Sequence, residues 1–138
     1  MIDLGSGSGS PAIPLKVSFP QITLTMIDST FKKCNFLQNV LDELKIDGYV
    51  VHGRIEDFKG EFDIVTARAV APLNELIRLA SPLLKKGGVL LAFKGPNFQE
   101  EVNSAKHIMT RLKFKIVEII DKNLEDLTRT ILIIKKNN

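Results

Sequence analysis

Apolar residues recur along the chain in two alternating patterns, one typical of strands and one typical of helices. Short runs of β-branched and apolar residues predict strands at residues 1–4, 22–27, 49–51, 62–66, 89–93, 114–120 and 129–135. Longer segments with apolar residues three and four apart predict helices at residues 11–18, 30–44, 73–84 and 98–112. The helix at 30–44 has the clearest period, with apolar positions at Phe31, Cys34, Leu37, Leu41 and Leu44.

Strands that alternate with helices predict a mostly parallel, doubly wound α/β sheet of the Rossmann-like type, because crossovers between parallel strands are right-handed. The helix at 73–84 is expected to end at the cations and glycines of residues 85–88. Residues 121–128 are too few and too polar for a crossover helix, so the last two strands are predicted to form an antiparallel hairpin. This layout predicts a single domain over residues 1–138.

Composition narrows the class of protein only slightly. The chain is 44% hydrophobic and 25% charged, which is ordinary for a soluble globular protein, and its net charge of +3 permits a nucleic-acid partner without requiring one. Its single cysteine, Cys34, excludes an internal disulfide, favours a cytoplasmic setting and is expected to be a core residue. The longest apolar run is too short to cross a membrane, and no signal peptide is expected.

The stretch from Gly5 to Gly9 carries the strongest chemical signal. Glycines let a backbone turn sharply and approach a ligand closely, and this run lies between a strand and a helix, which disfavours a flexible linker. Dinucleotide sites use G-x-G-x-x-G. Here the spacing is G-x-G-x-G with Asp3 two residues upstream, which favours S-adenosylmethionine over a nicotinamide cofactor and marks Gly5 and Gly7 as contacts.

Polar residues follow two further strands at the edge where ligands of such sheets bind. Asp28 is predicted to accept hydrogen bonds from ribose hydroxyls; the alternative is that Asp28 or Ser29 caps the following helix. Ile55 and Glu56 are candidates for contacting an adenine ring, although the local sequence alone favours a solvated turn.

Two cations lie at the ends of later strands. Arg68 is expected to hold a carboxylate, a phosphate or a base edge, unless it pairs with Glu56 or Glu75. Lys94 is interpreted as a second cation at the same rim. His52 and His107 lack the spacing of metal ligands, so no metal site is predicted.

Together these residues resemble the glucose-inhibited division protein B family, which methylates nitrogen 7 of a guanine in 16S small-subunit ribosomal RNA. The resemblance is carried by DLGSGSGSPAIPL, TMIDSTFKKCNFL, VVHGRIEDF, FDIVTARAVAPL, PLLKKGGVLLAFKG and RTILIIKK. It implies an rRNA (guanine-N7)-methyltransferase in the cytoplasm, a monomer whose partner is 16S rRNA or the small ribosomal subunit. The implied cofactor contacts are Gly5, Ser10, Ile55, Glu56 and Arg68.

The chain departs from the family pattern at three places. The family has a large apolar residue where Ser10 stands and a glycine where Ala12 stands, which predicts weaker cofactor binding. Family members also carry a helical segment before the first strand, so the chain is interpreted as N-terminally truncated relative to them.

The implied chemistry needs no catalytic base, since nitrogen 7 carries a lone pair and no proton, and no catalytic residue is assigned. No NPPY-type motif follows the fourth strand, which disfavours methylation of an exocyclic amine. Two alternatives stay open: a truncated, non-catalytic remnant that keeps the fold, and an NAD-dependent oxidoreductase.

Overall fold

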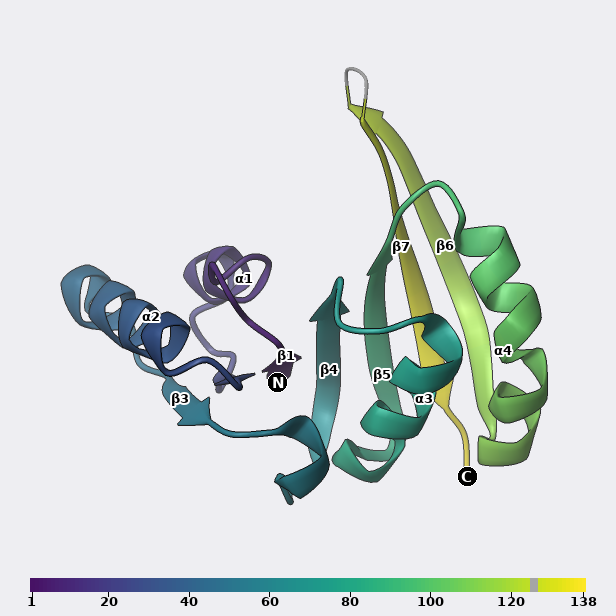
Figure 1. Cartoon of the computed structure of the whole chain (residues 1–138), viewed down its shortest axis with the longest axis horizontal. Helices are drawn as coiled ribbons and strands as arrows, with labels where there is room; N and C mark the ends of the chain where they lie inside the picture. Colours follow the sequence, from purple (N-terminus) through teal and green to yellow (C-terminus); the bar gives the residue numbers. More distant parts are fainter. Residues whose placement is uncertain (125–126) are drawn as a thin grey trace. The chain divides into compact units, whose positions relative to one another are not determined.

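The computed structural model describes residues 1–124 and 127–138, and the side chains of residues 1–121 and 130–138. The chain forms two compact units, residues 1–58 and 59–138, and each is described here by itself (Figure 1). The single domain expected over residues 1–138 stays a prediction.

The first unit is built from three parallel strands joined by helices. Their order in the sheet is β3-β2-β1, so the carboxyl ends of all three strands lie at one edge. The elements are β1 (Ile2–Leu4), α1 (Ala12–Ser18), β2 (Thr25–Asp28), α2 (Phe31–Leu44), β3 (Tyr49–His52) and the 3-10 helix η1 (Ile55–Asp57).

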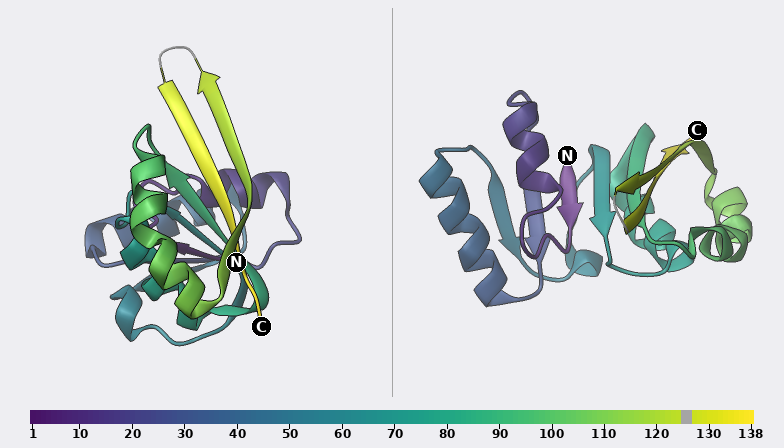
Figure 2. Two further views of the ribbon diagram at one scale, coloured as in Figure 1. Left: turned by 90° about the vertical axis from the view of Figure 1, so that its right-hand side faces the viewer. Right: turned by 90° about the horizontal axis from the view of Figure 1, so that it is seen from above.

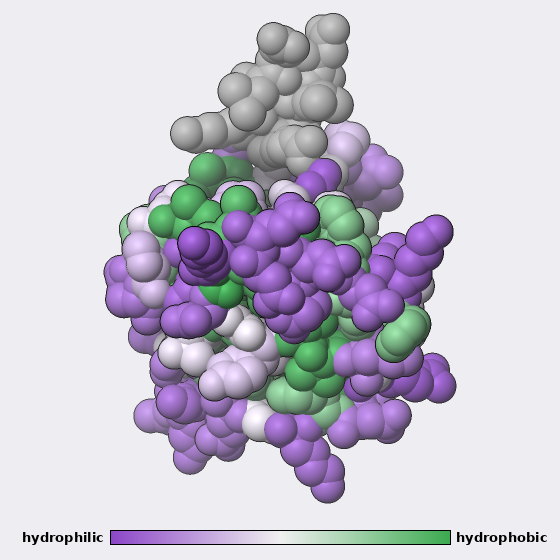
Figure 3. All heavy atoms as spheres, turned by 90° about the vertical axis from the view of Figure 1, so that its left-hand side faces the viewer, coloured by the Kyte–Doolittle hydropathy of each residue, from purple (hydrophilic) through white to green (hydrophobic). Residues whose placement is uncertain are grey.

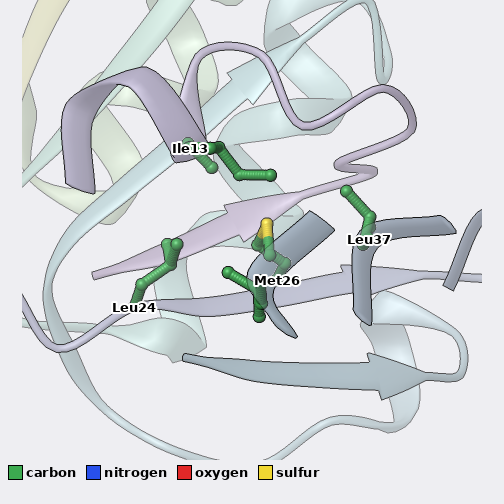
Figure 4. Packing of buried hydrophobic residues seen from close by; sticks show 6 residues of the cluster. Ile13, Leu24, Met26 and Leu37 are labelled. Carbon is green, nitrogen blue, oxygen red and sulfur yellow. The ribbon is translucent and has the colours of Figure 1, made fainter. Parts of the chain in front are cut away.

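Both helices of this unit pack on the same apolar core. Ile13 of α1, Met26 of β2 and Leu37 of α2 point toward one another in Figure 4, and each is buried. The helical period of α2 aligns Cys34, Leu37 and Leu41 on its buried face. One face of the molecule carries hydrophobic surface among hydrophilic side chains (Figure 3), and this unit exposes Phe31, Phe36 and Tyr49.

The second unit contains a mixed sheet of order β4-β5-β7-β6. Strand β4 is parallel to β5, and β7 is antiparallel to both β5 and β6, which confirms the predicted hairpin. Helices α3 and α4 lie side by side over one face of this sheet (Figure 2). The elements are β4 (Phe62–Arg68), α3 (Leu73–Ala80), the 3-10 helix η2 (Ser81–Leu83), β5 (Leu84–Lys94), α4 (Phe98–Leu112), β6 (Phe114–Leu124) and β7 (Leu127–Lys136).

The expected end of the helix over residues 73–84 is wrong. The helix predicted over 73–84 ends at Ala80 and the chain continues as the 3-10 helix η2, because Pro82 has no N–H with which to continue the α-helical hydrogen bonds. The residues expected to close that helix, 85–88, instead lie within β5, where Gly87 has φ +81° and the register with β4 shifts.

Strand β2 begins at Thr25 rather than at residue 22. Its partner β1 has only three residues, Ile2–Leu4, and the first of them pairs with Thr25. The preceding residues form a turn in which the Ile22 N–H donates to the Phe19 carbonyl. The predicted polar connection at 121–128 is shorter than expected, since β6 continues to Leu124 and β7 begins at Leu127.

Among the residues that the structure describes, no helix has the length and apolar character that a bilayer span requires.

Candidate functional site

The glycine turn between β1 and α1 adopts backbone conformations that require glycine. Gly5, Gly7 and Gly9 have φ values of +62°, +51° and +89°, in the region that side chains with a Cβ rarely adopt. Gly9 is also needed for space, because a Cβ there would lie 2.6 Å from the Ile13 Cδ1 atom. The turn therefore packs directly on the unit's core while Gly5 stays exposed.

Backbone hydrogen bonds hold this turn to the sheet. The Ser6 N–H donates to the Ile27 carbonyl at 3.2 Å, and the Gly9 N–H donates to the Ser6 carbonyl at 2.7 Å. The Ile13 N–H, in the first turn of α1, donates to the Gly9 carbonyl at 2.7 Å. The turn is thus fixed at both ends by main-chain groups and is preorganised.

Asp28, the last residue of β2, is joined to this turn. Its Oδ2 atom accepts from the Gly7 N–H at 3.0 Å, and its Oδ1 atom accepts from the Thr30 N–H at 2.9 Å. The second bond closes a turn just ahead of α2, but the N-cap of that helix is Thr30 and it has no side-chain cap hydrogen bond, so the expectation that Asp28 or Ser29 caps the helix is wrong. A carboxylate has about four acceptor sites, so two N–H donors leave capacity for hydroxyl donors. Asp28 is only 7% exposed, so a ligand would reach it from one side.

Two side chains around Asp28 have structural roles. Cys34 is buried on α2, as predicted, and its Sγ atom lies 3.4 Å from the Asp28 carbonyl oxygen. Burial and the nearby Asp28 carboxylate raise the pKa of the Cys34 thiol, which keeps it protonated and a poor nucleophile. His52 contacts the ring of Phe31 edge-on and lies 3.0 Å from the Ser29 carbonyl oxygen through Nε2.

The remaining predicted residues of the first unit follow β1 and β3. Ser10 is exposed at the end of the glycine turn. Ile55 is half-buried and Glu56 exposed in η1, directly after β3 at the same sheet edge. Glu56 pairs with Arg54 at 3.4 Å, a solvent-exposed contact of small energetic value. The hydrogen bond from the Gly7 N–H joins the turn to Asp28. Ser10, Ile55 and Glu56 lie at the same end of the strands.

Arg68 is the exposed last residue of β4 and belongs to the second unit. Its part in cofactor binding therefore stays a prediction. The residue that follows it, Ala69, has φ +52°, a conformation that costs about 1 kcal/mol for a residue with a Cβ. The segment after β4 thus leaves the strand through a sharp, constrained turn.

Lys94, interpreted from the sequence as a rim cation, is instead buried, with its side chain 7% exposed. Its Nζ atom lies 2.9 Å from Glu101 Oε1 and donates to the Ala71 carbonyl at 2.9 Å. Sequence reasoning missed Glu101. The available signal was weak: an acidic residue in the first turn of a helix is common, since it favours the positive end of the helix dipole.

Comparison with solved structures shows the fold, and comparison with related sequences shows the family. Solved structures share the fold at low identity. A methyltransferase from Pyrococcus furiosus superposes with a TM-score of 0.81 at 17% identity, covering 99% of this chain and 74% of that one. The magnesium protoporphyrin IX methyltransferase ChlM from Synechocystis PCC 6803, solved with bound SAM, gives 0.77 at 19% identity, covering 99% and 69%. The chain therefore has the Rossmann-like α/β fold of class I methyltransferases, as predicted.

Sequence comparison identifies the family. Ribosomal RNA small subunit methyltransferase G of Caldanaerobacter subterraneus subsp. tengcongensis is 41% identical over 145 aligned positions, which cover 99% of this chain and 60% of that protein. The chain spans about 60% of the length of the curated relatives it matches. The GidB family model, described as rRNA small subunit methyltransferase G, matches residues 1–131. The resemblance seen in the sequence is confirmed: the chain belongs to the GidB family.

Proposed function

We propose that this chain binds S-adenosylmethionine at the strand ends of its first unit and methylates nitrogen 7 of a guanine in 16S ribosomal RNA. It would act as a cytoplasmic monomer on the RNA or on the small ribosomal subunit. The observation that carries the proposal is the hydrogen bond from the Gly7 N–H to Asp28 Oδ2, which ties the glycine turn to the acid after β2. Family membership supports the choice of an RNA substrate.

The residues of the first unit suit the parts of this cofactor. Asp28 keeps acceptor capacity for ribose hydroxyls next to an exposed Gly5 that leaves room for a close approach. The half-buried Ile55 offers an apolar surface for adenine, and Glu56 an acceptor for its amino group. The small side chain of Ser10 leaves that end of the site open.

S-adenosylmethionine supplies a methyl group on a positively charged sulfur. The chain's own task is to bind and orient, because the lone pair of nitrogen 7 attacks without first losing a proton. Holding two reactants in line accounts for about 7–11 kcal/mol of barrier lowering in well-aligned systems. The target guanine must be unstacked to be reached, as is usual for enzymes that modify bases.

The proposal is tested by binding and by product analysis. Calorimetric titration should detect S-adenosylhomocysteine and not NAD. Methyl transfer from radiolabelled cofactor to small-subunit RNA should yield 7-methylguanosine on nucleoside mass spectrometry. Asp28→Asn should weaken binding, whereas Asp47→Asn, an exposed carboxylate ahead of β3, should not.

The alternatives make different predictions for the same measurements. Binding of S-adenosylhomocysteine without any methyl transfer would favour the non-catalytic alternative. Preferential binding of NAD would favour the oxidoreductase.

A further inference from the structure

The segment between β4 and α3 is held by two side chains that lie far from it in sequence. The Lys94 Nζ atom, at the end of β5, donates to the Ala71 carbonyl at 2.9 Å. Glu101 Oε1, in the first turn of α4, accepts from the Leu73 N–H at 3.1 Å. Lys94 and Glu101 also pair with each other at 2.9 Å. We call this four-residue arrangement, Ala71, Leu73, Lys94 and Glu101, the loop clamp.

The clamp is protected from water to a degree unusual for an ion pair. The side chains of Lys94 and Glu101 are 7% and 27% exposed. An ammonium group so deeply buried is costly unless an opposite charge and hydrogen-bond acceptors surround it. Glu101 and the Ala71 carbonyl supply these, so Lys94 is committed to the clamp and is not available as a rim cation.

The clamp satisfies main-chain groups where the chain leaves β4 and enters α3. The first N–H groups of a helix have no partner within the helix, and the Leu73 N–H is one of them. Pro72, which precedes α3, offers no N–H and no side-chain cap, and Glu101 from another helix supplies the acceptor. The clamp thus fixes both the carbonyl at Ala71 and the helix start at Leu73.

We propose that Lys94 and Glu101 are positioning residues for methyl transfer, which fix the segment from Arg68 to Leu73. This inference rests on the proposed function, because the segment follows the carboxyl end of β4, and ligands of such sheets bind beyond the carboxyl ends of the strands. The segment begins with the constrained turn at Ala69, and the clamp restrains its far end. Neither clamp side chain needs to touch cofactor or RNA.

The direct test measures hydrogen exchange at the Leu73 amide by NMR. Glu101→Ala removes its acceptor, so exchange at Leu73 should accelerate about tenfold or more. Glu101→Gln keeps a side-chain oxygen that can accept and should retain much of the protection. Glu100→Ala is the matched control, since Glu100 is the exposed neighbour in the same helical turn.

The second readout is kinetic. Lys94→Met and Glu101→Ala should lower kcat about tenfold or more while the KM for S-adenosylmethionine changes less, because misplacement of about 1 Å can cost a hundredfold in rate. The active fraction is counted by the stoichiometry of S-adenosylhomocysteine titration, so that loss of folded protein is not read as loss of kcat. Glu101→Gln should recover part of the rate, and Glu100→Ala should match the wild type.

If either single variant fails to fold, the double variant Lys94→Met/Glu101→Leu removes both loop contacts and leaves no buried charge unpaired. Replacing a buried ion pair by apolar residues is often neutral for stability. Faster Leu73 exchange together with a reduced kcat in this variant would support the clamp.

Unchanged Leu73 exchange in every variant would overturn the proposal. So would faster exchange with a kcat equal to that of Glu100→Ala. If the wild-type chain transfers no methyl group, the proposed function is contradicted, and the Leu73 exchange rates alone then decide whether the clamp holds the segment.

Discussion

The turns after β1 and after β4 are immobilised by different means. The turn after β1 uses glycine conformations, main-chain hydrogen bonds and the carboxylate of Asp28. The segment after β4 uses a buried ion pair between Lys94 and Glu101. The glycine conformations of the first turn are encoded locally, although the Asp28 carboxylate lies 21 residues from Gly7. The second depends on side chains 23 and 28 residues away from the groups they hold.

This difference determines how each turn should respond to substitution. A turn held by backbone geometry fails when a side chain is added. A segment held by side chains fails when one is removed. Substitutions in and around the turn after β1 test the first half of that contrast, and the Leu73 amide serves as a reference from the other turn.

The largest effect is expected for Gly9→Val. A Cβ would lie 2.6 Å from Ile13 Cδ1 and 3.3 Å from Leu37 Cδ2, in a backbone with φ +89°. Overpacking and the unfavourable φ together should lower the free energy of unfolding by about 2–6 kcal/mol. Chemical denaturation measures this loss. Gly53→Ala is the control, because nothing lies within 4 Å of a Cβ there, and equal losses in the two variants would contradict the packing argument.

Asp28→Ala should have the second-largest effect on stability. It removes the acceptor of the Gly7 and Thr30 N–H groups, and hydrogen bonds to charged groups are worth about 1.5–3 kcal/mol each, less whatever water recovers. We expect stability to fall by about 2–4 kcal/mol and exchange at the Gly7 amide to accelerate. Exchange at Leu73 should stay as in the wild type. Acceleration at both amides would show that the two turns are not independently held.

A smaller effect is expected for Ser10→Phe, which should strengthen ligand binding, whereas the two preceding substitutions should lower stability. Ser10 is exposed at the end of the glycine turn, where the family resemblance places an apolar cofactor contact. Covering part of the ligand with an aromatic ring should tighten S-adenosylhomocysteine binding by on the order of 1 kcal/mol, which is several-fold in Kd. Calorimetric titration of both proteins compares the affinities. A Kd that stays the same or rises would mean that residue 10 does not face the ligand.

The smallest effect is expected for the reactivity of Cys34, whose Sγ atom lies next to the Asp28 carbonyl oxygen. Burial first and the Asp28 charge second raise the pKa of the thiol above its ordinary value, so the native protein should react slowly with iodoacetamide at neutral pH. The reaction rate should rise only as the pH passes that raised pKa. Asp28→Asn removes the charge and should move the rate profile toward lower pH. A profile that matches the denatured chain would contradict the environment described for Cys34.

Sequence patterns predicted the elements well where local forces dominate. The period of residues 30–44 predicts α2 and the burial of Cys34, Leu37 and Leu41, although Phe31 and Leu44 of the same pattern are exposed. The hairpin of β6 and β7 follows from a short polar connection. The pattern failed at residues 81–88, because an apolar helical period continued past Pro82 into residues that pair with β4. Helical period and strand pairing compete there, and only the neighbouring strand decides between them.

The candidate site likewise has features that the sequence predicts and features that only the structure reveals. The glycine turn and Asp28 were visible because a motif and a strand end mark them. The bond between Gly7 and Asp28 was not, since it crosses 21 positions of sequence. The sequence predicts Lys94 as a second cation at the rim of the site, because charge patterns carry no information about burial.

By itself the sequence determined the alternation of strands and helices, the conformation of the glycine turn and the family. Those features depend on φ preferences, side-chain period and residue identity, which act over a few neighbouring positions. Tertiary structure alone decided that Glu101 meets Lys94 and that both hold the segment after β4. Such a contact exists only once α4 has docked beside α3, because an ion pair gains from burial only when the fold brings both charges and their hydrogen-bond partners together.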